Sequence, residues 1–155
     1  MSIVQTAATI DHMVGKEQRF QISANTSQWS AVVITNRLGW WQRRALQSLY
    51  EISSLPENWD SYGSRPPTEN AVECAKRLII QIDRDNFLQP RIIPISGGGV
   101  QLAWHSGVRE LEIEISTSGF IVEYLKSERG EPLDDGLLEI EDRSRIDTFL
   151  SWLIA

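Results

Sequence analysis

The sequence predicts an α+β fold: an antiparallel meander of about four strands with helices packed on one face. Two observations predict this class. Three stretches carry apolar residues at three- and four-residue steps, which is typical of amphipathic helices. Before the last of these stretches the period changes to two, and glycine-containing turns separate the short runs. Because the helices offer apolar stripes, we expect them to cover the buried face of the sheet.

A chain of 155 residues is long enough for one domain with a sizeable core. Residues 1–26 have weak periodicity and many small polar residues, so we expect a loosely ordered arm there. We expect a single α+β domain over residues 27–155. Its first element is a β-branched run at residues 29–35, which predicts a short strand.

The three helices are predicted from their apolar stripes and from polar residues at their starts. Asn36, Thr68 and Asp142 each precede a periodic stretch and are residue types that cap helices. The only cysteine, Cys74, falls on the apolar stripe of the second helix, where we expect it to pack as a small hydrophobe. The predicted helices span residues 37–53, 68–85 and 143–154.

The meander is predicted from short runs separated by turns. Pro94 cannot donate a backbone hydrogen bond, so the first run should be an edge strand. The polar residues 126–136 predict an exposed loop, and residues 137–140 predict a further short strand. The main strands are expected at residues 91–95, 100–105, 108–115 and 120–125.

A stretch dense in aromatic and turn-forming residues joins the first two predicted helices, residues 55–67 (LPENWDSYGSRPP). Trp59 and Tyr62 predict a loop folded onto the domain, because a large aromatic side chain gains nothing in water. Asn58, Asp60 and Ser61 should close turns through side-chain hydrogen bonds. We therefore interpret Trp59, Asp60 and Tyr62 as a structural loop.

Charge and composition exclude several classes of function. The net charge is −6, and residues 105–155 carry 12 acidic against 5 basic side chains, which disfavours nucleic acid except through a partner. No apolar run approaches the ~18 residues of a membrane span. Residues 1–16 lack a basic start followed by an apolar block, and a single cysteine suits a reducing compartment. We expect a cytoplasmic protein.

Three glutamates form the strongest candidate site. Glu110, Glu112 and Glu114 alternate along a predicted strand, so they share one face at steps of about 7 Å. That spacing suits carboxylates that share a hydrolytic water or a cation with Asp60, as in a small hydrolase. The plain alternative is the solvated face of a half-exposed sheet. Concentrated negative charge also favours docking of a basic protein surface.

No residue is predicted to be catalytic, and no metal or other cofactor is expected. The triple glycine at residues 97–99 lacks the Lys and Ser or Thr that follow a phosphate-binding loop. His12 and His105 lie far apart, and neither has a metal-ligand spacing with Cys74. Cys74 has no neighbouring histidine in the sequence to activate a thiolate.

A second cluster lies on the first predicted helix. Arg37, Arg43 and Arg44 flank Trp40 and Trp41, a composition that permits nucleic-acid binding if the arginines share one exposed face. A solvated helix face is the plainer interpretation. Trp40, Arg43 and Arg44 are also candidates for binding a protein partner.

Three motifs in order carry a resemblance: LPENWDSYGSRPP, GGGVQLAWH at residues 97–105 and LEIEI at residues 111–115. The set resembles a family of small uncharacterised bacterial proteins that combine an ENWDxYG loop with GGVQLEW and LEIEI strands. The resemblance covers residues 55–124. It implies accessory components of mobile gene clusters, including toxin–antitoxin and defence modules, and implies no catalytic residue. Ala103 departs from the family, which usually has Glu there.

The leading expectation is a non-enzymatic accessory protein, antitoxin-like, an inhibitor or an adaptor, that acts through protein–protein contacts. Its partner would be another protein with a basic surface, in a homo- or hetero-oligomer. The alternatives are a hydrolase using Asp60 with Glu110, Glu112 and Glu114, and nucleic-acid binding through Arg37, Arg43 and Arg44.

Overall fold

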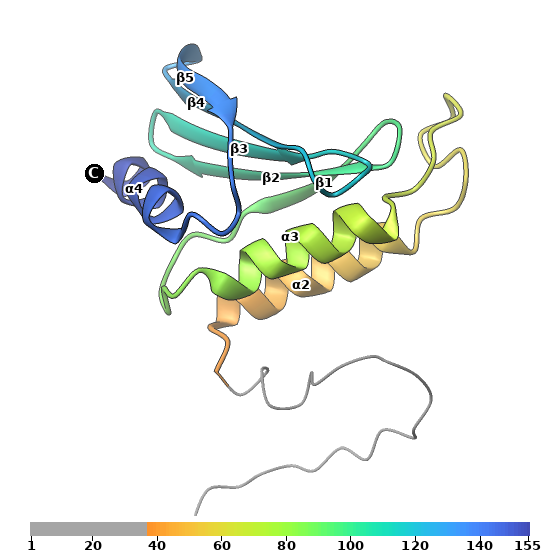
Figure 1. Cartoon of the computed structure of the whole chain (residues 1–155), viewed down its shortest axis with the longest axis horizontal. Helices are drawn as coiled ribbons and strands as arrows, with labels where there is room; N and C mark the ends of the chain where they lie inside the picture. The colour runs from red at the N-terminus through yellow and green to blue at the C-terminus, as the bar shows by residue number, and fades with distance from the viewer. Residues whose placement is uncertain (1–36) are drawn as a thin grey trace, which may run out of the picture.

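The computed structural model describes residues 37–155, which form a two-layer α+β fold (Figure 1). Five antiparallel strands lie side by side in chain order, and the three helices of the described range pack on one face of that sheet. The predicted fold class is confirmed, with one strand more than expected. The predicted strand at residues 29–35 and the arm at residues 1–26 lie outside the described residues. The elements are α2 (Trp40–Ser53), α3 (Glu69–Gln81), β1 (Arg91–Ile95), β2 (Gly99–Ser106), β3 (Arg109–Ile115), β4 (Val122–Glu128), β5 (Glu131–Leu137) and α4 (Arg143–Ile154).

The first helix begins three residues later than its apolar stripe predicts. Gly39 is the N-cap of α2, and the side-chain oxygen of Gln42 accepts a hydrogen bond from its backbone N–H at 2.8 Å. This single contact satisfies one of the donors that a helix start leaves without an intrahelical partner. The expected cap, Asn36, lies outside the described residues.

The second helix ends at Gln81, four residues earlier than predicted. Ile82 is already extended, and the side-chain amide of Gln42 donates to the carbonyls of Ile79 and Ile82 at 3.0 and 2.9 Å. A side chain from α2 therefore satisfies carbonyls that the end of α3 exposes. At the other end Thr68 accepts from the Ala71 N–H, so the predicted cap is confirmed.

The segment predicted as a polar loop is instead a hairpin. β4 extends to Glu128, and Arg129 and Gly130 form a two-residue turn with φ values of 56° and 79° before β5 begins. Positive φ at both central residues is the geometry whose twist matches paired strands. β5 is almost wholly exposed, so it pairs with β4 without burying apolar residues. Its polar sequence therefore resembled that of a loop, and the predicted loop at residues 126–136 is wrong. The short strand expected at residues 137–140 is therefore also wrong beyond Leu137.

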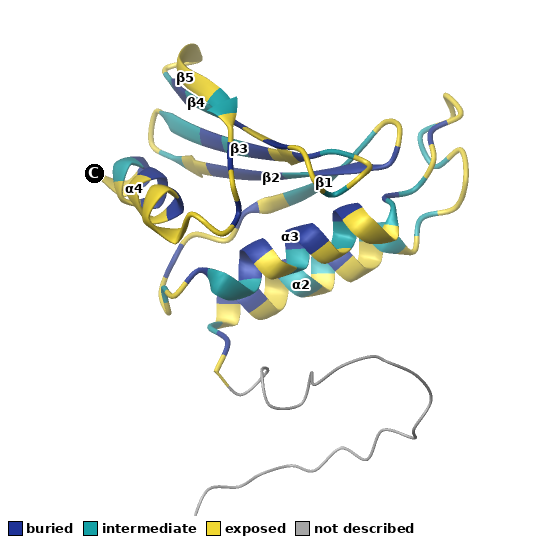
Figure 2. Cartoon of the chain, in the orientation of Figure 1, coloured by how far each residue is buried: buried dark blue, intermediate teal, exposed yellow. Residues whose placement is uncertain are grey.

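The core lies between the sheet and the helices. Leu111, Ile113 and Ile115 of β3 are fully buried there, and Trp41 of α2 and Trp104 of β2 are enclosed with them. Both indoles also have hydrogen-bond partners, the carbonyls of Arg84 and Leu88. Figure 2 shows how burial concentrates on the surfaces where the two layers meet.

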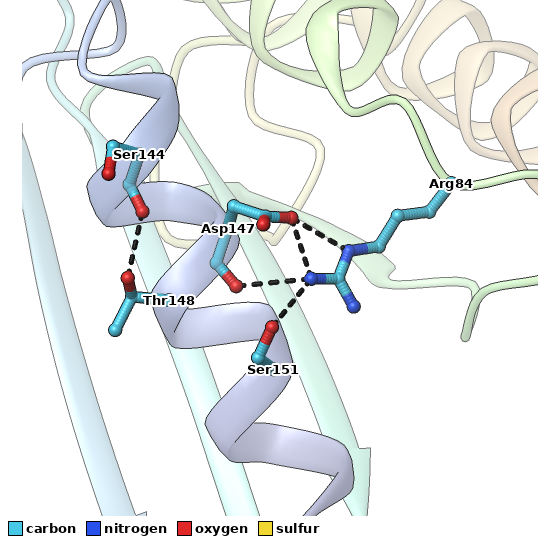
Figure 3. A network of polar contacts seen from close by, with 5 residues as sticks. All are labelled: Arg84, Ser144, Asp147, Thr148 and Ser151. Atoms are coloured by element: carbon cyan, nitrogen blue, oxygen red, sulfur yellow. Dashed lines mark hydrogen bonds and ion pairs between the residues drawn. The ribbon is translucent and has the colours of Figure 1, made fainter.

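The last helix is held to the rest of the domain by apolar and polar contacts. Phe149 packs on Tyr124 with ring centroids 4.5 Å apart. At the rim, Figure 3 shows Arg84 reaching α4, where its guanidinium donates to the Asp147 carboxylate at 2.6 and 3.0 Å and to the Ser151 hydroxyl at 2.7 Å. Asp142 caps α4 as predicted, accepting from the Arg145 N–H.

Candidate functional site

The side of the sheet away from the helices is left uncovered by the described residues, and we call it the open face. Side chains alternate along a strand, so the residues between the buried ones point to this side. In β3 these are the three predicted glutamates, of which Glu110 and Glu112 are half-buried and Glu114 is exposed. The open face also takes Gln101, Ala103 and His105 from β2, and Glu123 and Leu125 from β4.

The strand register extends the predicted glutamate row across two strands. Glu114 is the direct neighbour of Glu123 in the antiparallel pair β3–β4. Directly opposed side chains of this kind lie about 4.5–5.5 Å apart at Cβ, and like charges so placed repel. We call Glu110, Glu112, Glu114 and Glu123 the acidic row. The carboxylates of Glu112, Glu114 and Glu123 have no hydrogen bond or ion pair to any residue of the described range.

A hollow of about 370 Å³ lies over Ala103. Its wall includes Glu110, Glu112, His105 and Arg91. The Glu110 carboxylate lies 3.1 Å from Nδ1 of the His105 ring. The small side chain of Ala103 leaves this space open. Two carboxylates, one guanidinium group and one imidazole ring therefore line the hollow.

Asp60 takes part in a different structure. Its carboxylate accepts hydrogen bonds from the Ser64 hydroxyl at 2.5 Å and from the backbone N–H groups of Tyr62 and Ser64 at 2.9 and 3.1 Å. The Ser64 hydroxyl bond, more than the backbone bonds, holds the pKa of Asp60 below its usual range. Within residues 37–155 all these bonds stay inside the loop. Asp60 therefore holds the loop in shape and does not contact the acidic row.

Residues 55–67, which we call the Trp59 loop, fold only partly as predicted. The Asn58 side chain accepts from Gly63, and Asp60 closes its turn, as expected. Trp59 is half-buried, and its indole N–H donates to the Arg65 carbonyl of the same loop at 3.0 Å, so it braces the loop without entering the core cluster. The prediction for Tyr62 is wrong, because this side chain is 92% exposed.

The loop nevertheless holds a defined shape. Asn58 and Ser61 both have positive φ, 61° and 65°, which non-glycine residues seldom adopt unless the surroundings impose it. The buried Ser64 hydroxyl lies 2.7 Å from that of Ser96, which ties the loop to the β1–β2 turn.

The basic cluster is divided between two surfaces. Arg37 lines a groove of about 990 Å³ together with charged side chains of both signs, among them Glu73, Arg84 and Glu141. Arg43 and Arg44 are exposed on α2, where Arg43 also donates to the Leu38 carbonyl at 3.2 Å. Trp40 is 55% exposed beside them, whereas Trp41 is buried in the core.

Cys74 is buried on α3, as its place on the apolar stripe predicts. Burial raises the pKa of its thiol, with the neighbouring Arg77 acting in the opposite direction to a smaller extent.

Among the described residues, no three His, Cys, Asp or Glu side chains are gathered in a way that could hold a metal ion. No helix in residues 37–155 is both long and apolar enough to cross a bilayer.

Sequence reasoning missed Arg91 and His105 as neighbours of the glutamates. The signal was present in the hairpin: a two-residue turn at Gly107 and Val108 pairs Ser106 with Arg109 and so places His105 opposite Glu110. Comparison with known protein families, with curated proteins and with solved structures finds no match to this chain.

Proposed function

We propose that this protein is a non-enzymatic binding component that docks a basic surface of another protein on its open face. The observation that carries the proposal is the acidic row. Four carboxylates from two adjacent strands lie on a sheet face that no described helix covers, and three of them have no partner within residues 37–155. A fold that places its helices on one face leaves the other available for contact.

The electrostatics support a basic partner. Glu114 and Glu123 repel one another in the free protein, and a lysine or arginine placed between them removes that repulsion. Glu110 and Glu112 line the hollow over Ala103, together with Arg91 and His105, and offer two carboxylates to the end of one long basic side chain. Carboxylate–arginine contacts are directional as well as strong, which gives such a site specificity.

The role as an antitoxin, inhibitor or adaptor follows from the resemblance to small bacterial accessory proteins. In each of these roles the protein acts by occupying a surface of its partner. The acidic open face suits the positively charged surfaces that many nucleic-acid-directed proteins expose.

The test compares three full-length baits against a lysate of the native host. The first is the wild type, and the second replaces Glu110, Glu112 and Glu114 with Gln. The third is a matched control that removes three exposed carboxylates elsewhere, through Glu57→Gln, Asp83→Asn and Glu139→Gln. We expect a protein that binds the wild type and the control at low salt, and that is lost from the second bait.

The recovered partner is then purified and its binding kinetics are measured at low and high salt. Neutralising the acidic row should slow association more than it speeds dissociation, and should flatten the salt dependence. Equal capture by the wild type and the neutralised bait at every salt concentration would rule out the open face as the docking surface.

A further inference from the structure

The outer side of α2 has an unusual composition for a solvent-facing helix surface. The exposed residues of this helix recur at three- and four-residue steps and so form one stripe (Figure 2). We call them the outer stripe: Trp40, Arg43, Arg44, Gln47, Tyr50 and Glu51. The opposite side of the same helix enters the core through Trp41, Ala45 and Leu49.

Two large aromatics stand out in this stripe. Trp40 is 55% and Tyr50 is 69% exposed. Solvated helix faces are mostly built from Lys, Glu and similar residues. Trp, Tyr and Arg are instead the types that contribute most of the energy at protein interfaces. The outer stripe therefore has the composition of a contact surface.

The order of residues along the stripe makes it complementary to itself. In an antiparallel pair of α2 helices centred on Gln47, Arg43 of one copy faces Glu51 of the other. Arg44 then faces Tyr50, whose ring can accept a cation–π contact. Both contacts occur twice, because a two-fold axis repeats each of them. A parallel pair would instead oppose Arg43 to Arg43.

We propose that two copies of this chain associate through their α2 helices, antiparallel and about a two-fold axis at Gln47. The occupant of the outer stripe is thus a second copy, chosen by the match of Arg43 to Glu51. α2 has 14 residues and is about 21 Å long. A helix pair of this length buries less than the ~800 Å² per partner of a standard interface, so the dimer is weak and dissociates on dilution.

This arrangement goes beyond the proposed function and does not compete with it. The outer stripe is the exposed side of α2, opposite the residues that enter the core, whereas the acidic row lies on the side of the sheet away from the helices. A dimer through α2 therefore leaves two acidic faces free and directed outward. A partner with two basic sites would then bind with increased avidity.

A charge exchange tests the pairing in the full-length protein. The change Arg43→Glu places two carboxylates opposite one another, and Glu51→Arg places two guanidinium groups opposite one another, so each single change should abolish the dimer. The double change R43E/E51R restores opposite charges across the axis and should restore it. Sedimentation velocity over a range of concentrations at low salt measures each state. A wild type that stays monomeric throughout, or a double variant that stays as monomeric as the single ones, overturns the proposal.

A cysteine placed on the axis gives a second, independent readout. Gln47→Cys should form an intermolecular disulfide under mild oxidation, while the control Glu139→Cys, exposed away from α2, should not. The native Cys74 is buried and provides the same background in both proteins. Equal cross-linking at both positions would mean that the disulfides form through random collisions between molecules. That result would overturn the proposed two-fold axis at Gln47. Capture of a basic partner by a monomeric wild type would leave the proposed function intact while this inference failed.

Discussion

The two faces of the sheet are made by the same strands and have opposite properties. In β2 and β3 the apolar residues that face the helices are fully buried, while most of the residues between them are polar or charged and meet water. Trp104 and His105 are adjacent in sequence, yet the first is 1% exposed and the side chain of the second 63%. The covered face determines whether the chain folds. The open face is free of that constraint, and its composition can serve binding.

The largest expected effect comes from truncating the covered face. Trp104→Ala removes a fully buried indole together with its hydrogen bond to the Leu88 carbonyl. We expect a loss of about 3–5 kcal/mol in the free energy of unfolding, measured by urea denaturation.

The neighbouring residue provides the control for this comparison. His105→Ala, one position along on the open face, should change stability by no more than ~0.5 kcal/mol. Losses of similar size at both positions would mean that the two faces do not differ as described.

The rim of the covered face should respond less strongly. Arg84→Ala removes the contacts to Asp147 and Ser151 that join α4 to the segment after α3. Charge-assisted hydrogen bonds contribute about 1.5–3 kcal/mol when buried, but the Asp147 side chain is 66% exposed, so we expect a loss of about 1 kcal/mol.

Arg37→Ala is the matched control, because the Arg37 side chain is exposed, lies outside the outer stripe and makes no contact of this kind within the described residues. It should leave the urea midpoint unchanged. If Arg84→Ala also left the urea midpoint unchanged, apolar packing alone would hold α4 in place.

The covered face was largely predictable from the sequence, because burial imposes a pattern. The alternation of Leu111, Ile113 and Ile115 with glutamates allows a single orientation of β3 in a two-layer fold. The same argument located Glu110, Glu112 and Glu114 on the opposite face.

The remaining elements were harder to predict because nothing apolar marks them. β5 pairs through its backbone and is exposed along its length, so its sequence resembles that of a loop. Tyr62 is exposed in a loop where Asn58 and Ser61 have positive φ, a backbone conformation that the aromatic content of this stretch does not indicate. His105 and Arg91 are neighbours of the glutamates because of the strand register. Register depends on turn length, which the residue pattern of the strands alone does not give.

A smaller effect of opposite sign is expected on the open face. Glu114→Gln removes one of two carboxylates that face each other across β3 and β4. We expect the free protein to become more stable by up to about 0.5 kcal/mol at low salt, and the gain to shrink as salt rises.

Glu139→Gln is the control, because this exposed carboxylate lies outside the strands and has no directly opposed cross-strand partner among the described residues. Urea denaturation at two salt concentrations measures both variants. A loss of stability on Glu114→Gln would show that the carboxylate has a favourable contact in the free protein, and would argue against its being held ready for a partner.

The smallest expected effect on stability comes from the Asp60 carboxylate, which lies in the loop and not on the open face. The pKa of Asp60 is lowered, chiefly by the Ser64 hydroxyl and then by backbone N–H groups. Because the folded-state pKa lies below the unfolded value of about 3.9, ionised Asp60 favours the folded state at neutral pH. That contribution is complete above the unfolded pKa and is lost as the pH falls through the folded one.

Asp60→Asn keeps an oxygen that can accept from the backbone but removes the charge and the acceptor used by the Ser64 hydroxyl. The variant should therefore have a lower urea midpoint than the wild type at pH 7, and the difference should narrow as the pH falls below about 4. Asp83→Asn, at an exposed carboxylate without such bonds in the described range, should show no narrowing. A difference for Asp60→Asn that stays constant from neutral to acidic pH would mean that the charge contributes nothing to the loop. The backbone hydrogen bonds, which asparagine can also accept, would then be sufficient to hold Asn58 and Ser61 in their positive-φ conformations.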